Sequence, residues 1–314
     1  MNDKTAAQAA PRPVDGVALQ RARQRVESAA QAPWLHQEMA RRMAERLSLF
    51  KRQPRTVLDW WPAGGGSLAA LQATLPEAEQ LQLGEPPASQ PLEKGRWSSW
   101  LAQVKRWGSQ PAMTSKVRHV ALADGPPAAQ ADLVWANMLL HHVQQPTALI
   151  QRWHDALAVD GFLMFSTLGP GTLPSLRALY RRQGWGEPMG ALVDMHDWGD
   201  MLVEAGFADP VMDQEVLTLT WATPAQALAE LRTLGANVHG QRFAGLRTPR
   251  WRDVLTREML QAESNPGQSP KVSLQFELVY GHAFKAAPRL PVAPETRIDV
   301  DTLRAALQKP RSRP

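Results

Sequence analysis

Three acidic residues, each at the end of a predicted strand, are the first candidates for chemistry in this chain. Asp59 closes the run TVLD, Glu85 closes LQLGE and Asp124 closes VRHVALAD. A Gly-rich turn at 62–66 follows Asp59, and leucines at helical spacing over 68–75 follow the turn. A strand, a Gly-rich turn and a helix in this order begin a nucleotide-type βαβ unit, because glycine lets a ligand approach the backbone closely. The sequence therefore predicts a cofactor crevice where the strands end.

A histidine pair, His141-His142, follows the strand predicted at 132–139 and would suit a metal ion or a general base. Neither a carboxylate nor a further histidine stands at ligand spacing from the pair, so no metal site is expected. Asn137 is interpreted as a strand-end cap or a cofactor contact rather than a catalyst. The chain has no cysteine, which excludes disulfides, thiolate catalysis and Cys-based zinc sites.

The elements that must position these residues alternate along the chain. Helices are predicted at 33–50, 68–75, 97–107, 146–159, 173–180, 194–207, 223–236, 249–262 and 299–308. Strands are predicted around 57–58 and at 81–85, 117–124, 132–139, 162–168, 216–221 and 272–285. Such alternation is typical of an α/β fold, in which a mostly parallel sheet carries helices on both faces.

The bulk properties fit one soluble domain with tails. Of 314 residues, 44% are hydrophobic, and no apolar run reaches the roughly 18 residues of a membrane span. Residues 1–30 carry no apolar h-region, so we expect no secretory signal, no membrane association and a cytoplasmic location. The expected division is a disordered tail at 1–15, a domain at 16–287 and a Pro/Arg-rich tail at 288–314. Within the domain, the core spans about 33–170, and the lid and closing strands span 171–287.

The charge balance is basic, with a net charge of +5 and a pI of about 9.8. A nucleic-acid partner is one interpretation of this balance. The arginines are scattered, however, and only the last few residues form a dense basic stretch, so no nucleic acid is expected. A basic enzyme that acts on an acidic partner is equally consistent.

Several segments together resemble one family. They are DLVWANMLLHHVQQPTALIQRWHDALAVDGFLMFST at 132–167, FSTLGPGTLPSLRALY at 165–180, ALAELRTLGANVHGQR at 227–242 and FELVYGHAFK at 276–285. The chain resembles, over roughly residues 30–285, the malonyl-carrier-protein O-methyltransferases of biotin synthesis, which are class I S-adenosylmethionine (SAM) methyltransferases. The resemblance implies a Rossmann-like α/β fold with a central, mostly parallel seven-stranded sheet, helices on both faces and a small helical lid. The assembly hydroxylase of mitochondrial complex I shares this scaffold.

The resemblance also implies a cofactor, a reaction and a partner. SAM would lie across the ends of the strands, with Glu85 accepting from the ribose and Asp124 meeting the adenine, although a turn-capping role for Asp124 is as plausible. The implied cofactor contacts are Asp59, Ala63, Gly64, Gly65, Glu85, Asp124, Gly125, Asn137 and Met138. The methyl group would pass to the free carboxylate of a malonyl thioester on an acidic acyl carrier protein. The candidate carboxylate anchors are Arg177, Arg181 and Arg232. A monomer or weak dimer is expected.

The first loop departs from the family pattern x-Gly-x-Gly-x-Gly. The matching positions are Trp61, Ala63 and Gly65, so the first glycine is replaced by the bulkiest side chain. We expect Trp61 to clash with the carboxypropyl end of SAM unless the loop shifts. The tyrosine that the family places over the cofactor has no clear match, and Trp34 is the nearest aromatic residue. Two other functions therefore remain as alternatives to methylation of a malonyl carrier protein. One is a binding or assembly factor that has lost the ability to bind SAM, and the other is a hydroxylase or a transferase for another acid.

Overall fold

A seven-stranded sheet forms the centre of the molecule. The computed structural model describes residues 14–84, 117–121, 128–243, 245–261 and 271–287. The strands are β1 (Thr56–Asp59), β2 (Glu79–Gly84), β3 (Val117–Ala121), β4 (Ala131–Ala136), β5 (Leu157–Leu168), β6 (Ala208–Trp221) and β7 (Val272–Phe284). They lie in the order β3-β2-β1-β4-β5-β7-β6, and only the two pairs made by β7 are antiparallel. This arrangement confirms the mostly parallel α/β fold predicted from the sequence.

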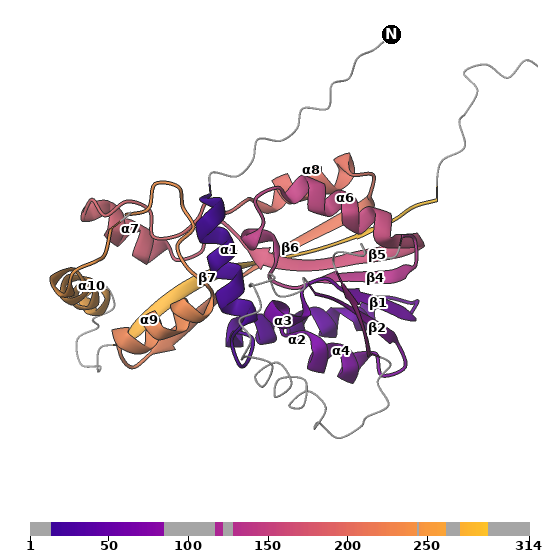
Figure 1. Cartoon of the computed structure of the whole chain (residues 1–314), viewed down its shortest axis with the longest axis horizontal. Helices are drawn as coiled ribbons and strands as arrows, with labels where there is room; N and C mark the ends of the chain where they lie inside the picture. Colours follow the sequence, from indigo (N-terminus) through magenta and orange to yellow (C-terminus); the bar gives the residue numbers. More distant parts are fainter. Residues whose placement is uncertain (1–13, 85–116, 122–127, 244, 262–270, 288–314) are drawn as a thin grey trace, which may run out of the picture.

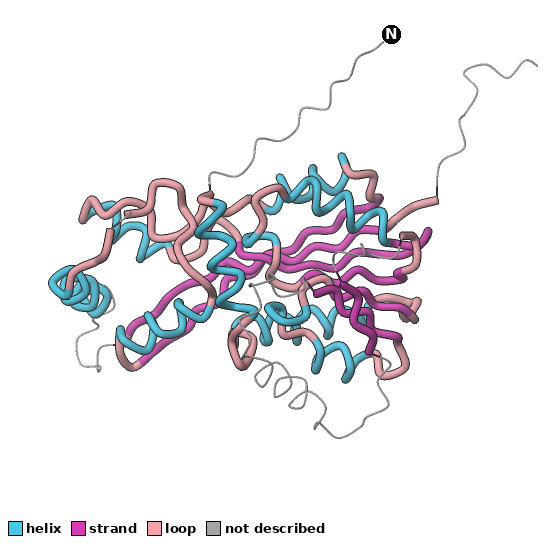
Figure 2. Tube along the Cα trace, viewed as in Figure 1, coloured by secondary structure: helices cyan, strands magenta, loops and turns pink. Residues whose placement is uncertain are grey.

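Helices cover both faces of this sheet (Figures 1 and 2). One face carries α2 (Trp34–Arg46), the short 3-10 helix η1 (Leu47–Leu49) and α4 (Leu68–Thr74), and the other carries α6 (Pro146–Ala156) and α8 (Met195–Glu204). The predicted stripe of Leu35, Met39 and Met43 on α2 is buried against the first face. Trp153 and Trp198 pack against the opposite face. The sheet therefore separates two apolar cores, and the ends of its strands lie between them.

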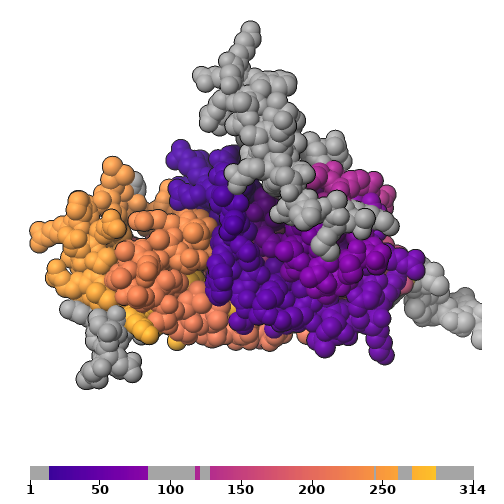
Figure 3. Space-filling model, turned by 90° about the horizontal axis from the view of Figure 1, so that it is seen from below, coloured from indigo at the N-terminus to yellow at the C-terminus, as the bar shows by residue number. Residues whose placement is uncertain are grey.

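A helical lid lies at the far ends of β6 and β7. It consists of α7 (Pro174–Arg182), α9 (Pro224–Thr233) and α10 (Pro249–Gln261). A further helix, α1 (Gly16–Glu27), runs between this lid and the core (Figure 3). The Asp15 amide donates to the carbonyl oxygen of Val238, and the Arg25 guanidinium donates to that of Gly235. These two hydrogen bonds hold α1 against the segment that follows α9.

Several predicted boundaries were wrong. Residues 16–27 were not predicted as a helix, because the buried side chains of α1 are few and lie among many polar ones. The helix predicted at 146–159 ends at Ala156, and β5 begins at once. The Asp160-Gly161 turn lies inside β5, where the pairing with β4 shifts register and Asp160 takes φ +64°. The strand predicted at 216–221 begins at Ala208, because an edge strand is half-exposed and lacks a continuous apolar run.

The predicted start of α9 is confirmed in detail. Thr223 is the N-cap, its hydroxyl accepts from the Gln226 amide, and Pro224 occupies the first helical position. The helices predicted at 97–107 and 299–308 lie outside the described residues, as does the end of the third predicted strand. Among the helices that the structure describes, none has both the length and the apolar character needed to span a membrane.

Candidate functional site

The first loop of the sheet begins at a buried acid. Asp59 ends β1 and is 2% exposed. Its Oδ1 accepts a hydrogen bond from the Trp61 amide at 3.3 Å, and its Oδ2 is buried without a hydrogen-bond partner among the described residues. Burial raises the pKa of this carboxyl to about 7, while the Trp61 amide lowers it only in part. Asp59 therefore holds the first loop through the Trp61 amide.

Replacement of Asp59 by asparagine is expected to remove a pH dependence of stability. A folded-state pKa above the unfolded value means that Asp59 stabilises the fold below about pH 4 and loses this contribution as pH rises through about 7. The asparagine side chain keeps an oxygen for the Trp61 amide without acquiring a charge. The free energy of unfolding of the variant, taken relative to that of wild type, should therefore rise by roughly 2–4 kcal/mol when the pH is raised from 4 to 8. Denaturant unfolding at both pH values measures this gain, and an unchanged difference between the two proteins would contradict it.

The predicted Gly-rich turn forms a short helix, α3 (Pro62–Gly65), which ends at Gly66 with φ +64°. Trp61 precedes it and is 3% exposed. Its indole N–H donates to Glu27 Oε1 of α1 at 2.6 Å. A Cβ added at Gly64 would overlap the indole ring of Trp61, so the ring lies directly on the Gly64 backbone. In this conformation the close approach that glycine permits at Gly64 is taken by the Trp61 ring.

Asn137 braces the same region from the end of β4. Its side-chain amide donates to the carbonyl oxygens of His36 at 2.7 Å and Gly65 at 2.6 Å. Its Oδ1 accepts from the Ser166 hydroxyl at 2.5 Å. Met138 follows, fully buried, with φ +54° and its amide bonded to the Ser166 carbonyl. Asn137 therefore joins α2, the first loop and β5, which agrees with its interpretation as a strand-end cap.

The histidine pair lies beside this brace. His141 and His142 belong to the short 3-10 helix η3 (Leu140–His142), and His36 of α2 faces them. The ring centroids of His36 lie 6.2 Å from His141 and 6.4 Å from His142. The Trp61 ring lies 5.2 Å from that of His142. The fold therefore places three imidazoles next to the loop that the sequence associates with the cofactor.

A cavity of about 320 Å³ opens between η3 and the lid. His141 and His142 line it, and most of the remaining wall is apolar and comes from α7, α9, α10 and β7 and from the segments 172–173, 188–192 and 234–238. Among the described residues that line it, three are arginines, Arg25, Arg232 and Arg252, and none is acidic. Through His142 the cavity connects to the Trp61 ring. This arrangement suits a short acyl chain with an anionic end, held beside the first loop.

The three predicted anchors take different positions. Arg232 lines the cavity and is exposed, and Arg181 is exposed on α7. Arg177 is half-buried, and its Nε and Nη2 are buried without a hydrogen-bond partner among the described residues. It shares a face of α7 with Leu173 and Tyr180, which line the cavity, although it is not itself a lining residue. Glu85, Asp124 and Gly125 lie outside the described residues.

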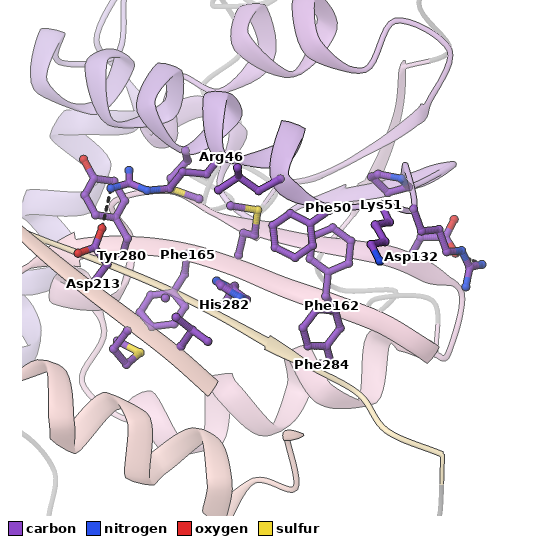
Figure 4. A pocket seen from close by; sticks show the side chains of 18 of the residues that line it. Arg46, Phe50, Lys51, Asp132, Phe162, Phe165, Asp213, Tyr280, His282 and Phe284 are labelled. Carbon is purple, nitrogen blue, oxygen red and sulfur yellow. Dashed lines mark hydrogen bonds and ion pairs between the residues drawn. The ribbon is translucent and has the colours of Figure 1, made fainter. Parts of the chain in front are cut away.

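A second cavity, of about 790 Å³, lies elsewhere (Figure 4). Phe50, Phe162 and Phe284 line it, and Arg46 and Asp213 form an ion pair at 2.8 Å at its other side. Of the residues predicted for the cofactor or the substrate, none that the structure describes lines it. The smaller cavity is therefore the candidate site, because it alone of the two adjoins the first loop and the histidines.

Sequence reasoning missed the contribution of the N-terminal helices. Glu27, Arg25 and His36 reach the site from α1 and α2, more than a hundred residues before η3. The one signal in the sequence was His36, which interrupts an otherwise apolar stripe between Leu35 and Met39. A single polar residue on a buried helical face is too common to predict a site.

Comparisons with known proteins place the chain among methyltransferases. A methyltransferase-domain family model matches residues 33–210. A malonyl-[acyl-carrier protein] O-methyltransferase from Gallionella capsiferriformans is 36% identical over 258 residues, which cover 82% of this chain and 86% of that protein. Proteins of the same name from Laribacter hongkongensis and Nitrosospira multiformis are each 34% identical, and the matches cover 81% and 85% of this chain and 84% and 88% of those proteins.

Proposed function

The chain belongs to the malonyl-[acyl-carrier protein] O-methyltransferase family, and we propose that it transfers the methyl group of SAM to the free carboxylate of a malonyl thioester on an acyl carrier protein. The observation that carries the proposal is the apolar cavity beside the first loop, with arginines and no acids in its wall. SAM is the methyl donor of this family and supplies an activated methyl group when bound.

Methyl transfer to a carboxylate needs little general acid or base catalysis from the protein. A malonyl carboxylate is already a nucleophile at neutral pH, so the chain must bind it, orient it and exclude water. The cavity wall of Leu173, Leu176 and Phe276 would exclude water from the acyl chain. The remaining requirement is a cation for the carboxylate, which would otherwise be desolvated without a partner.

Arg177 is the anchor that we propose for this carboxylate. A guanidinium with two buried, unpaired nitrogens is costly, and a carboxylate that passed the lining residues Leu173 and Tyr180 to reach Arg177 would satisfy both of them. Planar guanidinium and carboxylate groups match in a bidentate geometry. The exposed Arg181 and Arg232 lack this need for a partner, so we assign them no contact with the carboxylate.

The arginines Arg25, Arg232 and Arg252 form a basic rim, which we propose meets the acidic surface of the carrier protein. The double charge reversal Arg232→Glu/Arg252→Glu is expected to raise KM for malonyl-carrier protein about tenfold at low salt, and to leave kcat unchanged. The effect should shrink at high salt, because exposed charges are screened. Steady-state kinetics at two ionic strengths measure it.

Arg257→Glu provides a matched control, since it reverses an exposed charge on the same helix, α10, away from the cavity wall. A small malonyl thioester without a carrier protein should show unchanged kinetics with the double variant. Equal losses on the small substrate and on the carrier protein would contradict a docking role for the rim. A cytoplasmic location and a monomeric or weakly dimeric state belong to the same proposal.

Trp61 favours a second candidate function, a methyltransferase-fold binding factor without catalysis. Its indole occupies the backbone surface of Gly64, so SAM can bind only after the ring leaves. The ring is held by one side-chain hydrogen bond, to Glu27, and by packing against His36 and His142. Deletion of the gene separates the two functions: catalysis predicts a biotin auxotroph that an added copy rescues, and prototrophic growth would favour the binding factor.

A further inference from the structure

Three buried histidines converge beside the candidate site. His36 comes from α2, and His141 and His142 come from η3. Each can offer one ring nitrogen such that these three nitrogens all lie within 4.8 Å of one another. His36 is fully buried, and the other two are 9% and 5% exposed. Three ring nitrogens gathered in this way are the kind of ligand set that transition-metal ions bind in proteins.

The hydrogen bonds of His36 determine which of its nitrogens carries the proton. Its Nδ1 lies 2.7 Å from the carbonyl oxygen of Gly64, which can only accept, so Nδ1 donates and Nε2 keeps its lone pair. The Nε2 atom is buried without a hydrogen-bond partner among the described residues. A buried lone pair of this kind suits a Lewis acid.

The ring of His141 is also held through its Nδ1, which lies 3.2 Å from the Thr167 hydroxyl oxygen. In metal sites the ligating histidine commonly bonds through its second nitrogen to a carbonyl or a polar side chain, which fixes the ring. Gly64 and Thr167 would supply these outer partners here.

We propose that His36, His141 and His142 bind one divalent transition-metal ion, with Zn²⁺ as the probe. Neutral imidazoles favour zinc and neighbouring metals, whereas Mg²⁺ and Ca²⁺ require oxygen ligands. In a tetrahedral zinc site with Zn–N bonds of about 2.0–2.1 Å the nitrogens lie roughly 3.4 Å apart, so the rings need to close by about 1 Å. His141 and His142 also line the cavity, so the fourth position of the metal would face it.

This proposal is independent of methyl transfer. Three protein ligands with an open fourth position are typical of sites that bind a ligand, and a carboxylate in the cavity would fit that position. The rival explanation is that three neutral rings merely pack together. Packing leaves the lone pair of His36 unsatisfied, whereas a metal ion uses it.

The test is a titration of the full chain, produced without a polyhistidine tag and freed of metal by a chelator. Calorimetry with Zn²⁺ is expected to give one site per chain, and Co²⁺ is expected to give the visible absorption of tetrahedral nitrogen coordination. His36→Asn keeps a donor for the Gly64 carbonyl and removes Nε2, so it should weaken binding by on the order of 100-fold. His142→Asn should do the same. Thr167→Val removes an outer partner and should weaken binding about tenfold.

The control is His196→Asn, which removes an exposed histidine next to Asp194 and should leave the affinity unchanged. Circular dichroism confirms that each variant is folded, and the wild-type titration needs no variant at all. Two results would overturn the proposal. One is no stoichiometric Zn²⁺ or Co²⁺ binding by the wild-type chain, and the other is binding that survives both His36→Asn and His142→Asn.

Discussion

Trp61→Gly is expected to tighten the binding of SAM by about two orders of magnitude. We propose that SAM binds wild type only after it displaces the buried indole of Trp61, and the loss of a buried tryptophan costs about 3–5 kcal/mol. This cost is subtracted from the binding free energy, because only the open conformation is competent to bind. Since about 1.4 kcal/mol changes affinity tenfold, removal of most of the cost yields the predicted gain. Calorimetric titration with SAM and with its demethylated product measures it.

The same variant should lose stability when no cofactor is present. It removes the hydrogen bond to Glu27 and the contacts with His36 and His142, so its free energy of unfolding should fall by roughly 3 kcal/mol. Trp60→Gly is a matched control, because Trp60 is buried at the neighbouring position but packs against Trp153 rather than against the histidines. Trp60→Gly should destabilise the chain without tightening SAM binding. If Trp61→Gly fails to fold, Trp61→Leu tests the same point with a smaller gain. Unchanged SAM affinity in a folded Trp61 variant would contradict the account.

Arg177→Met should lower kcat/KM for malonyl-carrier protein by 100- to 1000-fold, the second large effect that we expect. The variant removes the charge that we assign to the substrate carboxylate, and loss of one partner from a buried charge pair costs about 2–5 kcal/mol. The same loss should appear with a small malonyl thioester, since Arg177 would contact the acyl group rather than the carrier protein. Steady-state kinetics on both substrates provide the measurement.

Stability distinguishes an anchor from a structural arginine. The Nε and Nη2 atoms of Arg177 have no hydrogen-bond partner among the described residues, so methionine at this position should leave the free energy of unfolding unchanged or raise it by about 1 kcal/mol. Arg181→Met, on an exposed position of the same helix, should change neither stability nor kinetics. A marked loss of stability with Arg177→Met, or equal kinetic losses for both variants, would show that Arg177 is not the anchor.

The spacing of apolar residues along the sequence was enough to predict most of the helices and strands. The apolar run FLMFSTL predicts a strand that is buried on both faces. The four-residue spacing of apolar side chains on α2 predicts a helix with one buried face. The edge strand β6 was only partly predicted, since its outward residues are polar and one face is exposed. The turn predicted at Asp160-Gly161 is an irregularity inside β5, because the pairing with β4, which lies outside the segment, continues the strand through it.

The site was less predictable, because its parts meet through tertiary contacts. The sequence identified Trp61 as an obstacle, yet the direction of its indole depends on Glu27 and His36 from the N-terminal helices. His36 and His141 are 105 positions apart, so ligand spacing along the chain could not pair them. The sequence offers Arg177, Arg181 and Arg232 as equal candidates for the anchor, and only the fold shows that Arg177 has buried nitrogens without a hydrogen-bond partner among the described residues.

The most direct test of the proposed function is methyl transfer by the purified wild-type chain. The chain is mixed with malonyl-acyl carrier protein and SAM that carries a labelled methyl group, and the product is analysed by mass spectrometry and alkaline hydrolysis. We predict a mass gain of one methyl group on the malonyl moiety, released by base as expected for a carboxylate ester. No methylated product at millimolar SAM, from the folded wild-type chain and from Trp61→Gly alike, would contradict the proposed function and leave the binding factor as the better account.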